Sequence, residues 1–489
     1  MDDRDMVDIR GGYFIGVDIG TTTFRVCLYG SSVNKCKLIF SREEKISLVL
    51  GNPNFPFSDC VEIEPSNLWS NFKIKCAIAR IPDLSQLISL ALCCQRNTFV
   101  TWNKKTLETC HNLITWKDGR AKQACASWNS SWTIKALNVV GTVAHFLTRS
   151  ERFKAAKMFS FIDAMVTHRF LVTLNHENST AMRELLADGD LALGCLDTWL
   201  ISKMTNGKVF VTEPSSASAT GMYDPFMGDW GKFILRIVDF PLDVLPELVE
   251  TAQQVAISDP HIFGIPVKIS SSLGDSQAAA FGSGCIKKNS VKISLGTGTF
   301  VDYVSGGEIH ASMKGMYPLV GWRIHKKSCY LVEGRDNYTS KSVQQAGLMQ
   351  LFTNVEDTSD IAEEVVAEPD LRFLPNFDEI RTPVDVESAF LGWKSTTTKA
   401  QMLRALLESI AFRVYHIWEV LCDEITVDLD NCVIRVCGGR VAENQFSGAK
   451  GAVLLAGIAT GTWTMKSIES GQFLEIEKVF SPQEKRERH

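Results

Sequence analysis

Short apolar runs along the chain predict buried strands, and two of these runs share an unusual local pattern. Residues 13–18 (YFIGVD) and 24–29 (FRVCLY) are of strand length and are separated by a turn of glycine and three threonines at residues 20–23. Residues 291–295 (VKISL) alternate as a strand should and run directly into a Gly-Thr-Gly-Thr turn at residues 296–299. The chain therefore uses one device twice, a strand that ends in a glycine–threonine turn.

The length of the chain and its breaker residues predict two domains. A chain of 489 residues exceeds what one hydrophobic core usually supports. Residues 255–269 (VAISDPHIFGIPVKI) carry the proline and glycine that are typical of a connection. We therefore expect a first domain at residues 1–265 and a second at residues 266–489.

Composition and charge exclude several classes of protein. The hydrophobic share of 45% and the charged share of 22% are ordinary for a globular protein, and the net charge of -5 offers no basic surface for nucleic acid. The 14 cysteines are scattered without ligand-like CxxC pairs, which favours reduced thiols in the cytoplasm. The acidic start MDDRDMVDIR is unlike a signal peptide, and no apolar run is long enough to span a bilayer.

Two carboxylates lie beside turns that suit phosphate chemistry. Asp18 ends the first strand, where a carboxylate next to hydroxyls can hold Mg2+ through water while the N–H groups of the turn meet a phosphate. Asp275 lies on a tight turn between Gly274 and Ser276, just before a short alanine-rich helical piece at residues 277–282. Asp275 is thus a candidate general base close to a candidate phosphate cradle.

A collinear series of segments resembles the sugar and polyol kinases of the FGGY family. The series comprises residues 60–69 (CVEIEPSNLW), 95–120 (from QRNTFVTW to ITWKDGR), 193–220, 330–345 and 400–412 (AQMLRALLESIAF). Within the family it is most similar to the glycerol kinases, in particular a divergent animal branch of them. The resemblance implies an α/β fold of two actin-like ATPase (ribonuclease H-like) domains around a central cleft.

The resemblance also implies a role for individual positions. Asp275 would accept the proton of the attacking hydroxyl, and Asp18 would place Mg2+. The acceptor alcohol would be bound by Arg96, Asn97, Trp116, Asp275 and Ser276. The phosphates would be held by the two turns and a nearby arginine, at Gly20, Thr21, Thr22, Thr23, Arg25, Gly296 and Thr297. The rest of the nucleotide would lie near Ser340, Gln344, Gly438, Gly439 and Glu443.

The resemblance implies that the protein phosphorylates a small polyol with ATP and requires Mg2+. The expected reaction converts glycerol to glycerol 3-phosphate. The sequence departs from the family pattern at Asn97, where glutamate is usual, and at Ser276, where glycerol kinases have glutamine. Met158 or Phe159 stands where a substrate-binding tyrosine is expected, and Glu443 replaces an asparagine. A helix–strand unit near Phe446 is also missing. These departures leave the identity of the polyol open.

Two other functions remain open on the sequence. A catalytically impaired relative would keep the fold as a nucleotide-binding or regulatory protein. An actin-like ATPase of the chaperone type would need the two turns but not the polyol-contacting segment at residues 95–120, which counts against it. The sequence also leaves a homo-oligomer open. The kinase reading depends on one spatial prediction, that Thr22 and Thr297 face each other across a crevice into which Asp275 opens.

Overall fold

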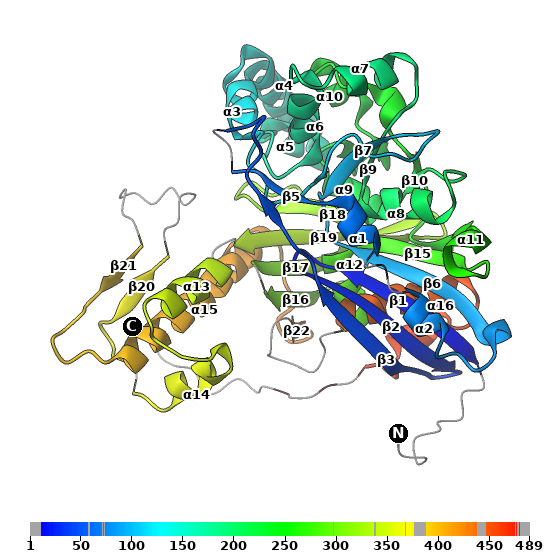
Figure 1. Ribbon diagram of the computed structural model, residues 1–489. Coiled ribbons are helices and arrows are strands. Elements are labelled where there is room, and N and C mark those ends of the chain that lie inside the picture. Colours follow the sequence, from blue (N-terminus) through cyan, green and yellow to red (C-terminus); the bar gives the residue numbers. More distant parts are fainter. Residues whose placement is uncertain are drawn as a thin grey trace.

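The computed structural model describes residues 11–479 except 57, 58, 71, 73, 297, 337, 338, 367, 376–387, 438–445, 475, 477 and 478. Two large sheets form the lower centre of Figure 1, a third sheet carries a cap of helices at the top, and a lobe of helices and a small sheet lies at the lower left. None of the helices in these residues is long and apolar enough to cross a membrane.

The first large sheet contains the first predicted turn. Its order is β14 (Ala252–Ile257), β15 (Lys268–Gly274), β6 (Leu87–Cys94), β1 (Gly12–Ile19), β2 (Thr23–Ser32) and β3 (Lys35–Lys45). Strands β1 and β2 form an antiparallel hairpin, and β6 lies parallel to β1. Almost every side chain of β1 is buried, because both faces of this strand are covered. The strands predicted at residues 13–18 and 24–29 are confirmed.

The second large sheet repeats this arrangement. Its order is β18 (Tyr317–Ile324), β19 (Lys327–Asp336), β17 (Thr299–Gly306), β16 (Ser290–Leu295) and β22 (Val433–Cys437). Strands β16 and β17 form the antiparallel hairpin, and β22 lies parallel to β16 as β6 does to β1. The strand predicted at residues 291–295 is confirmed. In the described part of the chain β22 is an edge strand, and Val433, Ile434 and Val436 are about 40–46% exposed.

Two helices cross between the large sheets. Helix α12 (Asp275–Gly282) follows β15, as predicted for residues 277–282, and packs against α16 (Ser447–Ala459). The crossing is so close that a Cβ atom on Gly282 or Gly451 would collide with the backbone of the other helix. Helix α16 also packs on β1, β6 and β15. Its N-terminus therefore lies close to the turn that follows β1.

The third sheet positions the segment that was expected to bind the polyol. Its order is β4 (Val49–Leu50), β5 (Val61–Ile63), β8 (Leu113–Ile114), β7 (Phe99–Asn103) and β9 (Leu191–Cys195). The cap in Figure 1 contains α3 (Lys122–Ser130), α4 (Trp132–Thr148), α5 (Glu151–Lys157), α6 (Val166–Asn175), α7 (Thr180–Ala187) and α10 (Lys232–Ile237). Helix α8 (Leu196–Met204) follows β9.

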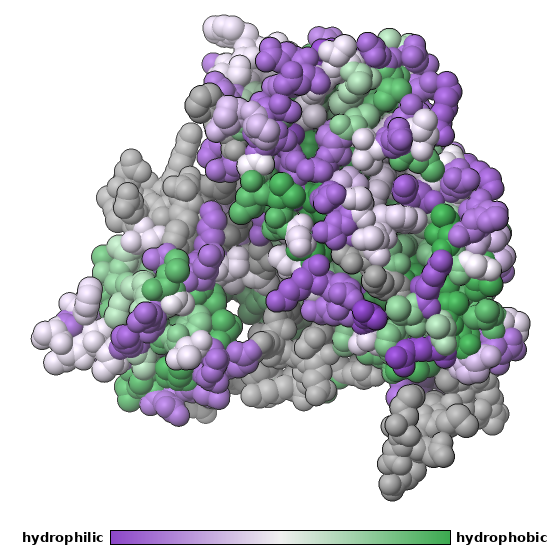
Figure 2. All heavy atoms as spheres, viewed as in Figure 1, coloured by the Kyte–Doolittle hydropathy of each residue, from purple (hydrophilic) through white to green (hydrophobic). Residues whose placement is uncertain are grey.

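The lobe at the lower left is organised around one long helix. Helix α15 (Lys399–Glu424) confirms and extends the helix expected at residues 400–412, and a capping box of Thr398 and Gln401 begins it. Around it lie α13 (Thr339–Leu348), α14 (Thr358–Glu363), β20 (Arg372–Leu374) and β21 (Ala389–Leu391). Figure 2 shows apolar residues gathered on this lobe, where Leu348, Trp393 and Phe412 are more than half exposed.

The remaining elements are short. They are α1 (Pro65–Ser70), α2 (Ile74–Ile78), β10 (Val211–Thr212), α9 (Pro214–Ser218), β11 (Tyr223–Asp224), β12 (Asp229–Trp230), β13 (Glu247–Leu248), α11 (Pro260–Phe263), α17 (Met465–Glu469) and single turns of 3-10 helix at Leu84–Gln86, Leu242–Val244 and Val355–Asp357.

Residues 255–269, which were predicted to connect two domains, lie within the first sheet. Strand β14 pairs with β15, and β15 pairs in parallel with β6, so this segment belongs to the first sheet. A division at residue 265 would separate β15 from its sheet. The pairing with β6 brings together residues far apart in the chain, and proline and glycine within a sheet connection look the same in sequence as those between domains.

Candidate active site

One cavity of about 1590 Å³ is lined by both predicted turns. Thr22 of the turn after β1 and Gly296 and Gly298 of the turn after β16 line it, as does Asp275 at the start of α12. Thr297 lies outside the described residues. The two turns and the carboxylate thus meet in one crevice, because the two hairpins face each other across α12 and α16.

Asp275 opens into the cavity from the first position of α12. Its side chain is 40% exposed, and its Oδ1 accepts a hydrogen bond from the backbone N–H of Ser276 at 2.8 Å. The Nε of Arg96 lies 3.8 Å from the same oxygen. Burial raises the pKa of Asp275 above its ordinary value, and the positive charge of Arg96 opposes this rise. A carboxylate with a raised pKa is a better proton acceptor near neutral pH.

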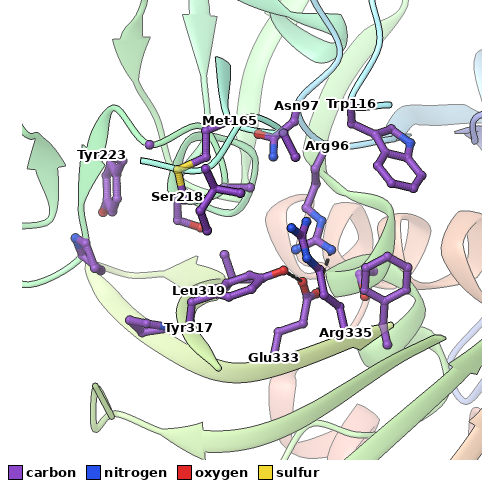
Figure 3. A pocket seen from close by; sticks show the side chains of 18 of the residues that line it. Arg96, Asn97, Trp116, Met165, Ser218, Tyr223, Tyr317, Leu319, Glu333 and Arg335 are labelled. Atoms are coloured by element: carbon purple, nitrogen blue, oxygen red, sulfur yellow. Dashed lines mark hydrogen bonds and ion pairs between the residues drawn. The ribbon is translucent and has the colours of Figure 1, made fainter. Parts of the chain in front are cut away.

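Arg96 is held by a buried acid from the second sheet. Its Nη2 donates to Oε2 of Glu333 at 2.7 Å, and the hydroxyl of Tyr317 donates to Oε1 at 2.8 Å (Figure 3). Glu333 is 1% exposed and lies directly across the β18–β19 ladder from Tyr317. Burial raises the pKa of Glu333 to about 7, against the pull of Arg96. The network orients the guanidinium of Arg96 toward Asp275.

Asn97 and Trp116 lie beside Arg96 (Figure 3). Asn97 adopts a left-handed backbone conformation with φ of 60°, and within the described structure its buried Oδ1 accepts no hydrogen bond. A buried acceptor without a donor is costly, so it is suited to a hydroxyl of a ligand. The indole Nε1 of Trp116 donates to Oγ1 of Thr21 at 2.8 Å. Trp116 therefore joins the expected polyol site to the first phosphate turn.

The turn after β1 is closed by its own backbone. The N–H of Gly20 donates to the carbonyl of Thr23 at 2.9 Å, and the side-chain amide of Gln95 donates to the carbonyl of Gly20 at 3.1 Å. Arg25 lies nearby, with its Nε 2.6 Å from Glu43. The hydroxyl of Thr22 approaches that of Thr23 at the tip. Backbone N–H groups and hydroxyls at such a tip suit an anionic group.

Asp18 is buried at the base of this turn. Its side chain is 12% exposed, its Oδ2 lies 3.7 Å from Arg25 Nη1, and the thiol of Cys93 donates to Oδ1 at 3.4 Å. Burial raises the pKa of Asp18 to about 6, Arg25 lowers it, and the charge of Asp275 raises it further. Gly448 of α16 packs so closely that an added Cβ would lie 3.2 Å from Oδ2.

The carboxylates of Asp18 and Asp275 fit a magnesium ion whose other ligands would be phosphate oxygens and water. No group of three or more His, Cys, Asp or Glu residues that could hold a metal is found in the described chain. Magnesium is commonly bound through one or two carboxylates together with waters and phosphate oxygens. Asp18 and Asp275 both line the cavity and can supply such carboxylates.

Ser276 lines the cavity, but its hydroxyl is already engaged. It donates to Oδ2 of Asp302 at 2.8 Å and accepts from Nζ of Lys292 at 2.6 Å. Lys292 and Asp302 are fully buried cross-strand partners, 2.9 Å apart. Asp302 raises the pKa of Lys292 although burial alone would lower it. This ion pair supports the first turn of α12, and with it Asp275.

The structure brings most, but not all, of the predicted residues together. The cavity is lined by Asp18, Gly20, Thr21, Thr22, Thr23, Arg25, Arg96, Asn97, Trp116, Asp275, Ser276 and Gly296. Ser340 and Gln344 of α13 are not among the residues that line it. Gly438, Gly439 and Glu443 lie outside the described residues.

The sequence reasoning missed several lining residues. Phe300, Tyr317, Glu333 and Arg335 line the cavity, and Arg96 lies 5.8 Å from the ring of Phe300. Phe300 could have been found, because it directly follows the Gly-Thr-Gly-Thr turn. Glu333 stands in an apolar strand, and a buried acid in a strand is itself a signal that a cation lies opposite.

Comparisons with known proteins find relatives over most of the chain. The family model of the N-terminal domain of FGGY carbohydrate kinases matches residues 13–282, and that of the C-terminal domain matches residues 291–448. Glycerol kinase 5 of Xenopus laevis is 36% identical over 447 residues, covering 89% of this chain and 91% of that protein. Glycerol kinase 5 of Homo sapiens is 33% identical, covering 97% of this chain and 92% of that protein.

Solved structures share the fold over nearly the whole chain. The structure of Plasmodium falciparum glycerol kinase with ADP has a TM-score of 0.80 and 20% identity, covering 95% of this chain and 93% of that one. Gluconate kinase from Lactobacillus acidophilus has a TM-score of 0.74 and 19% identity, covering 96% and 94%. The expected fold of two actin-like α/β domains around a cleft is confirmed.

Proposed function

The chain belongs to the FGGY family of carbohydrate kinases, and on that premise we propose that it transfers the γ-phosphoryl group of ATP to a hydroxyl of a glycerol-type polyol. One observation carries the proposal: Asp275, Arg96 and both glycine–threonine turns line the same cavity. Relatives named glycerol kinase support glycerol as the reference acceptor.

In the proposed reaction Asp275 orients the acceptor hydroxyl and takes its proton. The acceptor oxygen forms a bond to the γ-phosphorus while the bond from that phosphorus to the β–γ bridging oxygen breaks, giving ADP and a phosphate monoester. Positioning dominates such phosphoryl transfers. Arg96, fixed by Glu333, would donate to other hydroxyls of the acceptor, and Trp116 would contact its carbon atoms.

The phosphates would lie between the two turns. Backbone N–H groups at residues 20–23, at Gly296 and Gly298, and at the N-terminus of α16 would face them, because helix N-termini and glycine turns stabilise anions. Magnesium, when bound at Asp18, would neutralise phosphate charge. By resemblance, Ser340, Gln344, Gly438, Gly439 and Glu443 would contact the rest of the nucleotide.

We further propose a cytoplasmic location and a first domain that includes α12. All 14 cysteines are free thiols, which a reducing compartment maintains. A first domain that ends after α12 keeps β15 with its sheet. The second domain would then begin near β16.

Labelled ATP with a panel of acceptors tests the proposed activity. Purified protein is incubated with Mg2+, labelled ATP and glycerol, dihydroxyacetone, erythritol or a pentitol. Asp275→Asn should lower turnover by roughly two to four orders of magnitude while leaving binding of the acceptor nearly intact. The matched control is Asp188→Asn, an exposed aspartate outside the cavity. Equal turnover in Asp275→Asn and the wild type would remove Asp275 from the mechanism.

A second candidate is a relative that binds nucleotide without turnover. The specific observation is that Asn97 carries no charge and that the hydroxyl of Ser276 is engaged by Lys292 and Asp302. Binding of ATP without phosphorylated product from any acceptor would favour this candidate over the kinase.

A further inference from the structure

The cavity continues past the reacting groups into a side chamber. We define the side chamber by Met165, Met222, Tyr223, Met316 and Leu319, all of which line the cavity. Figure 3 shows Met165, Tyr223 and Leu319 on the opposite side of the pocket from Trp116. These residues come from the loop before α6, from β11 and the residue before it, and from β18 and the residue before it. The chamber therefore lies between the cap of helices and the second sheet.

The volume of the cavity exceeds the need of a nucleotide tail and a small triol. Small-molecule sites usually measure about 300–1,000 Å³, and this cavity measures about 1590 Å³. Asp275 and the residues of the side chamber line this one cavity. A larger acceptor than glycerol can be accommodated there.

The chemical character of the cavity changes along its length. Arg96, Asp275 and Glu333 give the reacting end its charge, whereas the five residues that define the side chamber carry none; Ser218 lies beside them (Figure 3). Of the 13 methionines in the chain, five line the cavity: Met158, Met165, Met222, Met227 and Met316. Methionine is flexible and polarizable, so it adapts to apolar ligands of variable shape. The apolar chamber suits an aliphatic chain.

One buried arginine ties the chamber to the acceptor site. Arg169 is fully buried and donates to the backbone carbonyl of Asn97 at 2.8 Å and to that of Met165 at 3.1 Å. It also donates to the carbonyl of Thr115, next to Trp116. The first chamber residue is thus held beside the residues expected to bind hydroxyls. A chain attached to a bound polyol would meet Met165 first.

Two hydrogen bonds join segments on either side of the side chamber. Oε2 of Glu151 in α5 accepts a hydrogen bond from the N–H of Ala311 at 2.8 Å. Oγ of Ser218 accepts one from the N–H of Val320 in β18 at 3.1 Å. These bonds fix the walls on either side, so the chamber is more than a gap left by separated domains.

Apolar side chains also mark the rim of the cavity. Phe153, Met158 and Phe233 line it and are 37%, 49% and 67% exposed. Apolar groups exposed at the edge of a pocket are typical of binding grooves. In addition, the uncharged Asn97 avoids the cost of placing a carboxylate beside an aliphatic chain.

We propose that the natural acceptor is a glycerol carrying one aliphatic chain, with its free hydroxyl at Asp275 and its chain in the side chamber. The inference rests on the proposed kinase function. The new bond joins the hydroxyl oxygen of the monosubstituted glycerol to the γ-phosphorus, the bond to the bridging oxygen of ATP breaks, and the proton passes to Asp275. The products are ADP and the phosphate monoester of the substituted glycerol.

The test measures kcat/KM for glycerol and for 1-O-ethyl-, butyl-, hexyl- and octylglycerol below their micelle concentrations. Each methylene that enters the chamber should raise kcat/KM about two- to fourfold until the chamber is filled. Met158→Glu and the size-conserving Met165→Gln should lower the hexylglycerol-to-glycerol ratio of kcat/KM at least tenfold. Met158 is half exposed, so its variant should fold. Met349→Glu, an exposed methionine outside the cavity, should leave the ratio unchanged.

The outcomes separate the two levels of the proposal. If glycerol is phosphorylated but kcat/KM stays flat or falls as the alkyl chain lengthens, the inference is overturned and the kinase function stands. A rise of kcat/KM with chain length that Met165→Gln does not reduce places the aliphatic chain outside the side chamber and also overturns the inference. Absence of turnover with every acceptor overturns the kinase function and the inference together.

Discussion

Replacing Asp18 by asparagine should stabilise the unliganded protein while weakening its hold on magnesium nucleotide. Asp18 is 12% exposed and lies 3.7 Å from Arg25 Nη1, a long ion pair. Burial raises its pKa from 3.8 to about 6 despite Arg25. The ionised carboxylate therefore costs stability near neutral pH. Asparagine keeps the shape of the side chain without the charge.

The structure sets the size of the effect. A rise of about two pKa units corresponds to about 3 kcal/mol at 1.36 kcal/mol per unit. The variant also deprives Arg25 of one anion, but Arg25 keeps Glu43 at 2.6 Å, so we expect a net gain of about 1–2 kcal/mol. For domains of this size the melting temperature should rise by about 2–6 °C.

The gain should depend on pH in one direction. Well below pH 3.8 Asp18 is protonated in both the folded and the unfolded protein, so the wild type carries no cost there. The cost grows as pH rises from about 4 to about 6 and is constant above that. The advantage of Asp18→Asn should thus be full at pH 7.5 and shrink as pH falls below about 6.

Calorimetric melting at pH 5, 6 and 7.5, with and without Mg2+ and ATP, measures both effects. Without nucleotide the variant should melt at the higher temperature, and with nucleotide it should gain less than the wild type. Asp188→Asn serves as the exposed control. A variant that melts lower at pH 7.5, or a difference independent of pH, would refute the burial argument. Equal stabilisation of both proteins by ATP would show that Asp18 does not serve the nucleotide.

Two further variants test the buried charges behind the site. Glu333→Gln should weaken the hold on Arg96 and lower kcat/KM for the acceptor about 10–100-fold, because the amide offers Arg96 a weaker acceptor than the carboxylate. The exposed Glu308→Gln should leave kcat/KM unchanged. Unchanged kinetics in Glu333→Gln would mean that the acid does not orient the arginine. Lys292→Met should cost about 3–5 kcal/mol in urea unfolding because it leaves Asp302 buried and unpaired. Adding Asp302→Leu should recover most of that loss, and no recovery would argue against the ion pair as the cause.

The predictable part of the site is the part that is local in sequence. The strands that flank both turns follow from short apolar runs, and Asp18 and Asp275 stand directly at the end of a strand or the start of a helix. A glycine–threonine turn after a strand has the same chemistry wherever the chain carries it. The roles of Thr22 and Gly296 could therefore be proposed without coordinates.

Which residues meet across the cleft was decided only by the tertiary structure. Glu333 reaches Arg96 across 237 positions of the chain, and its pairing with Tyr317 depends on the register of β18 and β19. The engagement of Ser276 by Lys292 likewise depends on β16 passing behind α12.

Contacts between distant segments of the chain also explain the remaining differences between the predictions and the structure. The segment at residues 255–269 joins the first sheet because β15 pairs with a strand that lies far earlier in the chain. The side chamber combines Met165 with Leu319, which come from different layers of the fold. Periodicity and turn chemistry act over a few residues, so the sequence alone determined the elements and their reactive ends. Pairing register and packing act between distant segments, so only the folded chain decided their partners.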